Sequence, residues 1–156
     1  GTFVCLVSSA AAVPHKLEEM RNSACPYEAL TYSPPGDGPF PLLLYLHGAG
    51  EQFGPLSGIL SPGATGTPPM ALLKGAAPEI LEQQFVMVAP HTSNGWSLEP
   101  ILQFTDCLLD KNSGFNIDQN RLFVTGHSMG GYGALLAATS HRFAAVVPVA
   151  PAGAPS

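Results

Sequence analysis

A chain of 156 residues, 46% of them hydrophobic, is long enough to bury one sizeable core, so a single domain is expected. The formal net charge of −5, with only 11% charged residues, leaves no basic stripe and argues against nucleic acid as a partner. No apolar run approaches the length of a membrane span, so the sequence predicts no transmembrane helix.

The first 28 residues have no clear role. Stretch 3–13 has the composition of the end of a secretory signal with a small-residue cleavage site, but it lacks a preceding basic region, and a buried strand explains it equally well. Both interpretations stay open, so the sequence does not decide between a secreted and a cytoplasmic protein. We assign residues 29–156 to one partial α/β domain.

From residue 29 onwards, short apolar runs alternate with segments of helical propensity. We expect strands at 29–33, 41–47, 85–89, 122–126 and 144–150, and helices at 70–83, 98–110 and 129–140. Strands that alternate with helices are typical of a mostly parallel sheet with helices on both faces. The predicted fold class is therefore α/β.

Ser128 lies at a sharp predicted turn between the strand at 122–126 and the helix that follows it. Gly126 and Gly130 stand two residues either side of the serine, where a Cβ would collide in so tight a turn, and Gly131 lets the helix lie close to the sheet. Such a corner exposes the serine Oγ beside the positive end of a helix dipole. We expect Ser128 to be a nucleophile on this elbow.

A second glycine-rich segment, His47-Gly48-Ala49-Gly50, ends the strand expected at 41–47. A glycine-rich segment directly after a strand is typical of an oxyanion loop, because glycine lets the backbone approach a substrate closely. The N–H groups of Ala49 and Met129, with Gly50 as a further candidate, are predicted to converge on a carbonyl oxygen as it becomes negative. The loop and the elbow therefore describe one site.

With these motifs the chain resembles the α/β-hydrolase superfamily, and more narrowly its branch of predicted peptidases, polyhydroxybutyrate-depolymerase-like enzymes and feruloyl-type esterases. The resemblance runs from about residue 29 to residue 152. It rests on segments 41–51, 88–90, 118–121, 126–133 and 143–148 and on Trp96. It implies the α/β-hydrolase fold and hydrolysis of a small or polymeric carboxylic ester through an acyl-enzyme on Ser128. It also implies that no metal and no organic cofactor takes part.

The chain departs from that family in its catalytic partners. A serine needs a histidine as general base and a carboxylate to orient it, and in this superfamily both follow the serine in sequence. After Ser128 there is no Asp or Glu, and the one histidine, His141, stands at the far end of the elbow helix. That position is roughly 15 to 20 Å away. We therefore expect a C-terminally truncated chain without the last strand-helix units, and with acid and base in the missing part.

Three earlier histidines border the predicted site without making a convincing base. We expect His47 to brace the oxyanion loop and His127 to pack beneath the elbow. His91 follows the strand at 85–89, and together with His47 and Trp96 it is a candidate for lining the pocket. The glycine- and proline-rich loop 51–69 either borders that pocket or is a mobile surface loop.

The three cysteines do not settle the compartment. Cys5, Cys25 and Cys107 are odd in number and lack the spacing of a metal site, so buried free thiols are expected. Neither they nor the histidines suggest a bound metal.

Three hypotheses remain open at the level of the sequence. The first is a serine carboxylester hydrolase of which this chain carries the nucleophile and the oxyanion hole. The second is a catalytically inactive hydrolase-like module that binds an acyl or ester ligand. In the third, a partner chain supplies the missing strands. The oligomeric state stays undetermined.

Overall fold

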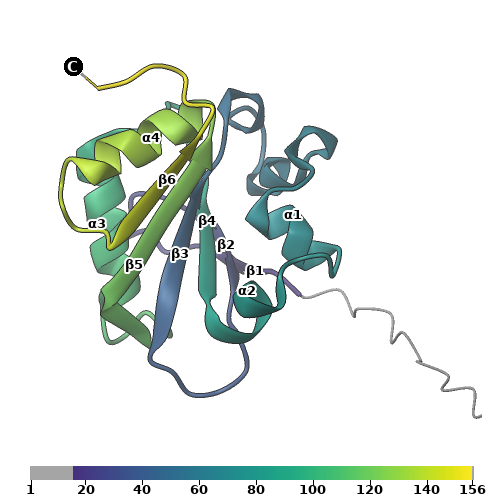
Figure 1. The fold of residues 1–156 in the computed structure, drawn as a ribbon, viewed down its shortest axis with the longest axis vertical. Coiled ribbons are helices and arrows are strands. Elements are labelled where there is room, and N and C mark those ends of the chain that lie inside the picture. The colour runs from purple at the N-terminus through teal and green to yellow at the C-terminus, as the bar shows by residue number, and fades with distance from the viewer. Residues whose placement is uncertain (1–15, 156) are drawn as a thin grey trace, which may run out of the picture.

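A six-stranded sheet runs through residues 16–155, the part of the chain that the computed structural model describes (Figure 1). Its strands are β1 (Glu18–Met20), β2 (Ala29–Tyr32), β3 (Phe40–Leu46), β4 (Val86–Pro90), β5 (Ile117–His127) and β6 (Ala145–Val149). The helices are α1 (Pro68–Leu73), α2 (Glu79–Gln84), α3 (Leu98–Leu109) and α4 (Met129–Ala138), with 3-10 turns η1 (Ala49–Glu51), η2 (Leu56–Leu60) and η3 (Pro62–Ala64). Stretch 3–13, with its two interpretations, lies outside the described residues.

The sheet is mostly parallel, as the sequence predicts. The strand order is β1-β2-β4-β3-β5-β6, in which β4, β3, β5 and β6 run parallel to one another. Strand β2 pairs antiparallel with β4, and β1 pairs antiparallel with β2. The parallel strands therefore end at one edge, the upper edge in Figure 1, where the loop after β3 and the start of α4 meet.

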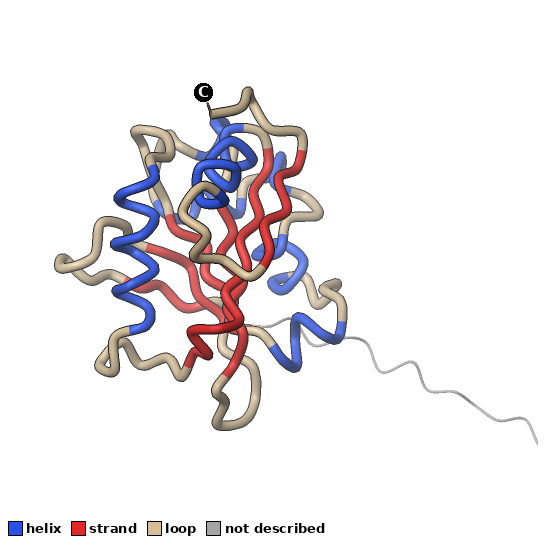
Figure 2. Tube along the Cα trace, turned by 60° about the vertical axis from the view of Figure 1, so that its left-hand side comes forward, coloured by secondary structure: helices blue, strands red, loops and turns tan. Residues whose placement is uncertain are grey.

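Helices cover both faces of the sheet because successive strand residues point to opposite sides. Leu42, Leu44 and Leu46 of β3 belong to a core that includes buried residues of α3 and α4. Tyr45, between them, belongs to the core on the other face, which includes residues of η2, α1 and α2. Figure 2 shows the helices on either side of the strands. The α/β prediction with helices on both faces is confirmed.

The single helix expected at 70–83 is wrong. Two short helices, α1 and α2, replace it. Gly75 takes a left-handed conformation, φ +64°, immediately after α1, and Pro78 is the N-cap residue of α2. A left-handed glycine ends a helix, and proline lacks the N–H that a continuing helix would need. None of the helices in residues 16–155 is long and apolar enough to cross a bilayer.

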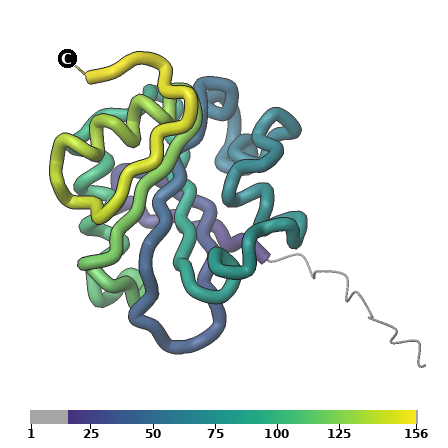
Figure 3. Tube along the Cα trace, in the orientation of Figure 1, coloured from purple at the N-terminus to yellow at the C-terminus, as the bar shows by residue number. Residues whose placement is uncertain are grey.

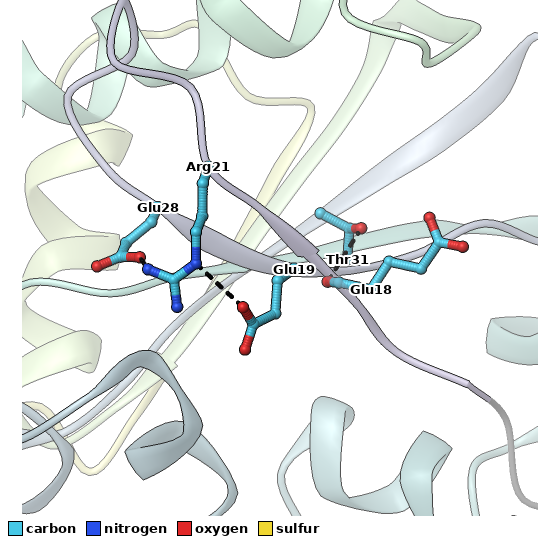
Figure 4. A network of polar contacts seen from close by, with 5 residues as sticks. All are labelled: Glu18, Glu19, Arg21, Glu28 and Thr31. Carbon is cyan, nitrogen blue, oxygen red and sulfur yellow. Dashed lines mark hydrogen bonds and ion pairs between the residues drawn. The ribbon is translucent and has the colours of Figure 1, made fainter.

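Strand β1, which the sequence analysis did not predict, is joined to β2 by polar contacts at the sheet edge (Figure 4). Arg21 pairs with Glu19 at 3.0 Å and also contacts Glu28, and the Thr31 hydroxyl donates to the Glu18 carbonyl at 3.4 Å. The hydrogen bond to Glu19 is the main cause of a raised Arg21 pKa. All three charged side chains are substantially exposed, so their ion pairs contribute little to stability.

Two cysteines form a disulfide, which corrects the expectation of free thiols. Cys25, in the segment between β1 and β2, is bonded to Cys107 on α3, with 6.0 Å between their Cα atoms. The residues are 82 positions apart, so the proximity arises only when α3 packs beside the β1–β2 connection. Spacing along the chain gave no indication of it. Cys5 lies outside the described residues.

Strand β6 is an outer strand of the described sheet and carries exposed apolar side chains. Val147 is 58% exposed and Val149 is 47% exposed, although α4 packs near the same strand. In Figure 3 the strand forms the yellow edge of the fold, next to β5. The side of β6 that carries these two valines is therefore open within residues 16–155.

Candidate active site

Ser128 joins β5 to α4 in a strained conformation. Its φ of +56° and ψ of −114° are unusual for a residue with a Cβ, and it is the N-cap residue of α4. Its N–H donates to the Val149 carbonyl at 3.0 Å, and its own carbonyl accepts from the N–H groups of Tyr132 and Ala152. The backbone of the serine is thus held from both sides, which leaves its side chain at the start of the helix.

The glycines around Ser128 are required by close backbone contacts. A Cβ on Gly126 would lie 2.2 Å from the Gly130 carbonyl oxygen, and a Cβ on Gly130 would lie 1.8 Å from the Leu46 carbonyl oxygen. A Cβ on Gly131 would meet the backbone of the segment after β6 at 2.9 Å. Any larger residue would push α4 away from β3 or from the segment that follows β6.

A hollow of about 410 Å³ lies in front of the serine. It is lined by Gly48, Ala49, Gly50, Glu51, Ser61, Gly63, His127 and Ser128. Ala49 is the first residue of η1 and Met129 is the first residue of α4, so their N–H groups have no acceptor within their own helices. The elbow and the glycine-rich segment after β3 therefore border the same space.

His47 is fully buried behind this hollow, and both of its ring nitrogens are engaged. The Thr92 N–H donates to Nε2 at 3.1 Å, so the ring proton lies on Nδ1, which donates to the Gly48 carbonyl at 2.7 Å. Burial is the main cause of a lowered His47 pKa, and nearby His91 adds to it; the Gly48 contact and Glu51 oppose it. A neutral, doubly engaged imidazole fixes the loop and has no free nitrogen for proton transfer.

The two other candidate pocket residues lie against His47. His91 stacks on its ring, and its Nε2 is 3.0 Å from the Glu51 carbonyl oxygen. Trp96 is 6% exposed, and its Nε1 donates to the His47 carbonyl at 2.9 Å. Neither residue lines the hollow in front of Ser128. Both support the loop that borders it.

His127 corrects the expectation that it packs beneath the elbow. Its side chain is exposed and lines the hollow next to Ser128, with Nδ1 3.6 Å from where a Cβ of Gly48 would lie. His141 follows α4 at the surface, far from the hollow along the helix, where the sequence analysis placed it.

A second cavity, of about 300 Å³, adjoins the first and was not anticipated. The two share Glu51, Gly63 and His127, and the second extends to Tyr45, Thr67 and Thr125. Loop 51–69 therefore borders the site, and it packs firmly, since Leu56 and Ile59 are buried in the core. The available signal was Tyr45, a phenol in an otherwise apolar strand, together with Glu51 in the glycine-rich segment that follows this strand.

Within residues 16–155, no group of three or more His, Cys, Asp or Glu side chains could hold a metal ion.

Comparisons with known proteins agree with this geometry. The profile of the prolyl oligopeptidase family matches residues 82–153, which include β4, α3, the Ser128 elbow and β6. A thermostable esterase is similar in structure, with a TM-score of 0.63, 25% sequence identity and 88% of this chain covered. The chain has the α/β-hydrolase fold. The resemblance and the fold expected from the sequence are confirmed.

Two further solved structures share the α/β-hydrolase fold at lower identity. A Pyrobaculum calidifontis esterase has a TM-score of 0.60 and 20% identity over 93% of this chain. The S-formylglutathione hydrolase FrmB from Staphylococcus aureus has a TM-score of 0.58 and 18% identity over 88%. The chain spans 41%, 49% and 57% of the lengths of the three structures. No curated protein matches it in sequence.

Proposed function

We propose that this chain provides the nucleophile and the oxyanion hole of a serine carboxylester hydrolase. Ser128 Oγ attacks the ester carbonyl and forms an acyl-enzyme, while the N–H groups of Ala49 and Met129, and of Gly50 in the alternative arrangement, bind the oxygen as it becomes negative. The observation that carries the proposal is the strained Ser128, φ +56°, at the N-terminus of α4 and on the wall of the same hollow as the loop 48–50.

The general base and the acid are proposed to lie outside residues 16–155. Within that range His47 has both nitrogens engaged, and His91 contacts the Glu51 carbonyl. His127 is next to the serine in sequence, and no hydrogen bond joins their side chains among the described residues. The sequence after Ser128 contains no Asp or Glu that could orient a histidine.

The same observation favours a second candidate, an inactive hydrolase-like module that binds an ester without cleaving it. Such a module would keep the hollow and the backbone donors and would have no need of a base. The two functions differ in one chemical event, the transfer of an acyl group to Ser128.

An external base tests this event directly. The parent chain and its Ser128→Ala variant are incubated with p-nitrophenyl acetate, with and without imidazole, and acylation is read by peptide mass spectrometry. Imidazole takes the place of a missing histidine, so we expect imidazole-dependent acetylation of Ser128 in the parent and none at position 128 in the variant.

Three outcomes are distinguishable. Acetylation at Ser128 that requires imidazole supports the proposed enzyme. Its absence under both conditions supports the binding module. Rapid acetylation without imidazole contradicts the assignment of the base to a segment outside residues 16–155 and would turn attention to His127.

A further inference from the structure

The second cavity contains a polar side chain that the fold leaves without a partner. Tyr45 is 3% exposed, and its hydroxyl forms no hydrogen bond within residues 16–155. Thr67 lies near the phenol, and its hydroxyl donates to the Ala64 carbonyl at 2.7 Å, but the two hydroxyls form no hydrogen bond with each other. Burial raises the pKa of Tyr45 to about 12, Glu51 adds to that shift, and Thr67 opposes it. The phenol therefore keeps its proton and remains a donor that needs an acceptor.

Glu51 brings a complementary group to the same cavity. The residue is 9% exposed, and its carboxylate takes part in no hydrogen bond or ion pair within residues 16–155. One of its oxygens, Oε2, is 3.3 Å from where a Cβ of Gly48 would lie, so the carboxylate is next to the oxyanion loop. It lines both the hollow in front of Ser128 and the cavity beneath Tyr45. A carboxylate in this position accepts hydrogen bonds and donates none.

One ligand group satisfies both side chains. A hydroxyl accepts a hydrogen bond from the Tyr45 phenol and donates its own proton to Glu51, whereas a methyl group does neither and an ammonium has no lone pair for the phenol. The cavity of about 300 Å³ is at the lower end of the size range for ligand sites, so it takes a short part of a molecule and not a whole substrate.

We propose that this cavity is a subsite of the Ser128 site that binds a hydroxyl substituent of the ester, with Tyr45 as donor and Glu51 as acceptor. The inference rests on the proposed ester site. It places the hydroxylated part of the ester in the second cavity and the ester carbonyl in the adjoining hollow in front of Ser128. Tyr45 and Glu51 are then specificity-determining residues, and neither takes part in bond breaking.

The test compares three esters of similar length. Ethyl 6-hydroxyhexanoate, ethyl heptanoate and ethyl 6-aminohexanoate differ only in a terminal hydroxyl, methyl or ammonium group. Their dissociation constants are measured by NMR titration of the Ser128→Ala variant, in which no acyl-enzyme can form. We expect the hydroxy ester to bind at least about 10-fold more tightly than the methyl analogue, because the analogue leaves both polar groups unpaired.

Substitutions of Tyr45 and Glu51 test whether these residues cause the preference for the hydroxy ester. Tyr45→Phe and Glu51→Gln, each made in the Ser128→Ala background, are expected to reduce the hydroxyl preference by about 3-fold or more. Tyr27→Phe is the matched control, because it removes a phenol hydroxyl beside Trp96 and Phe104, in the core on the other face of the sheet. Tyr45→Phe should not lower the melting temperature, since the hydroxyl that it removes has no partner.

The outcomes separate this inference from the proposed function. Equal affinities for the hydroxy and methyl esters, or a preference that survives Tyr45→Phe, overturn the subsite and leave the ester site standing. Tighter binding of the amino ester overturns the hydroxyl assignment in favour of a cation held by Glu51. If none of the three esters binds, the subsite and the proposed ester site both fail.

Discussion

A Cβ added to Gly130 would lie 1.8 Å from the carbonyl oxygen of Leu46. The close approach of α4 to β3 therefore requires glycine here, because the Leu46 oxygen belongs to the backbone and the position of a Cβ is fixed by the backbone that carries it, so neither atom can rotate away. The elbow therefore depends on a glycine two residues after the serine, and the hollow in front of Ser128 depends on the elbow.

Gly130→Val should disrupt the fold around Ser128. We expect a loss of at least about 3 kcal/mol in the free energy of unfolding, since the new side chain meets backbone on β3. Urea denaturation measures it. Gly63→Ala is the matched control, because nothing lies within 4 Å of a Cβ at that position. A Gly130→Val variant as stable as the parent would show that the turn geometry is wrong.

The Cys25–Cys107 disulfide should be a major contribution to stability. It closes a loop with a sequence separation of 82, for which the chain-entropy estimate is about 4.5 kcal/mol. We expect dithiothreitol to lower the melting temperature of the parent strongly. The Cys25→Ser/Cys107→Ser variant should melt at the temperature of the reduced parent and show no response to dithiothreitol. Equal melting temperatures for the parent with and without reductant would mean that the bond does not form.

His47 should make the folded state sensitive to mild acid. Its pKa in the fold is lowered, mainly by burial, so the unfolded chain binds a proton first as the pH falls below about 6.5. The stability associated with neutral His47 is therefore complete above that pH and is lost below it, by at most about 1.4 kcal/mol per pH unit.

A comparison of the parent with the His47→Gln variant isolates the contribution of His47 to this pH dependence. His47→Gln retains an acceptor for the Thr92 N–H but does not titrate, so its free energy of unfolding should change less than that of the parent between pH 7 and pH 5. Chemical denaturation across that range provides the comparison. Parallel pH profiles for the two proteins would rule out His47 as the source of acid sensitivity.

A fluorophosphonate probe reports whether Ser128 is activated in this chain alone. Such probes need a serine activated by a base, and no histidine of residues 16–155 forms a hydrogen bond with the Ser128 side chain, so we expect little labelling and little turnover of p-nitrophenyl esters. The Ser128→Ala variant sets the background for labelling at other sites. Rapid labelling confined to the parent would demonstrate a working base among the described residues.

Local patterns were sufficient to predict the framework of this protein. The apolar runs predicted β2, β3, β4 and β6 at positions close to those observed, whereas β5 begins at Ile117, before the predicted residue 122. The small residues around Ser128 predicted the strand-turn-helix corner. These features are readable because they depend on neighbours in sequence. The glycines are needed because they lie within the turn at Ser128, two residues from the serine. The alternation of buried side chains follows from the geometry of a single strand.

Contacts between distant segments decided the rest. The Cys25–Cys107 bond, the engagement of His47 by Thr92 and the exposure of His127 all arise from residues brought together by packing. The cavity between Tyr45 and Glu51 is of the same kind, because it forms only where loop 51–69 folds back over β3 and β5. The sequence by itself therefore determined strands β2 to β6 and the turn at Ser128. Only the tertiary structure decided which side chains face one another around them, because burial and hydrogen bonding depend on separation in space and not along the chain.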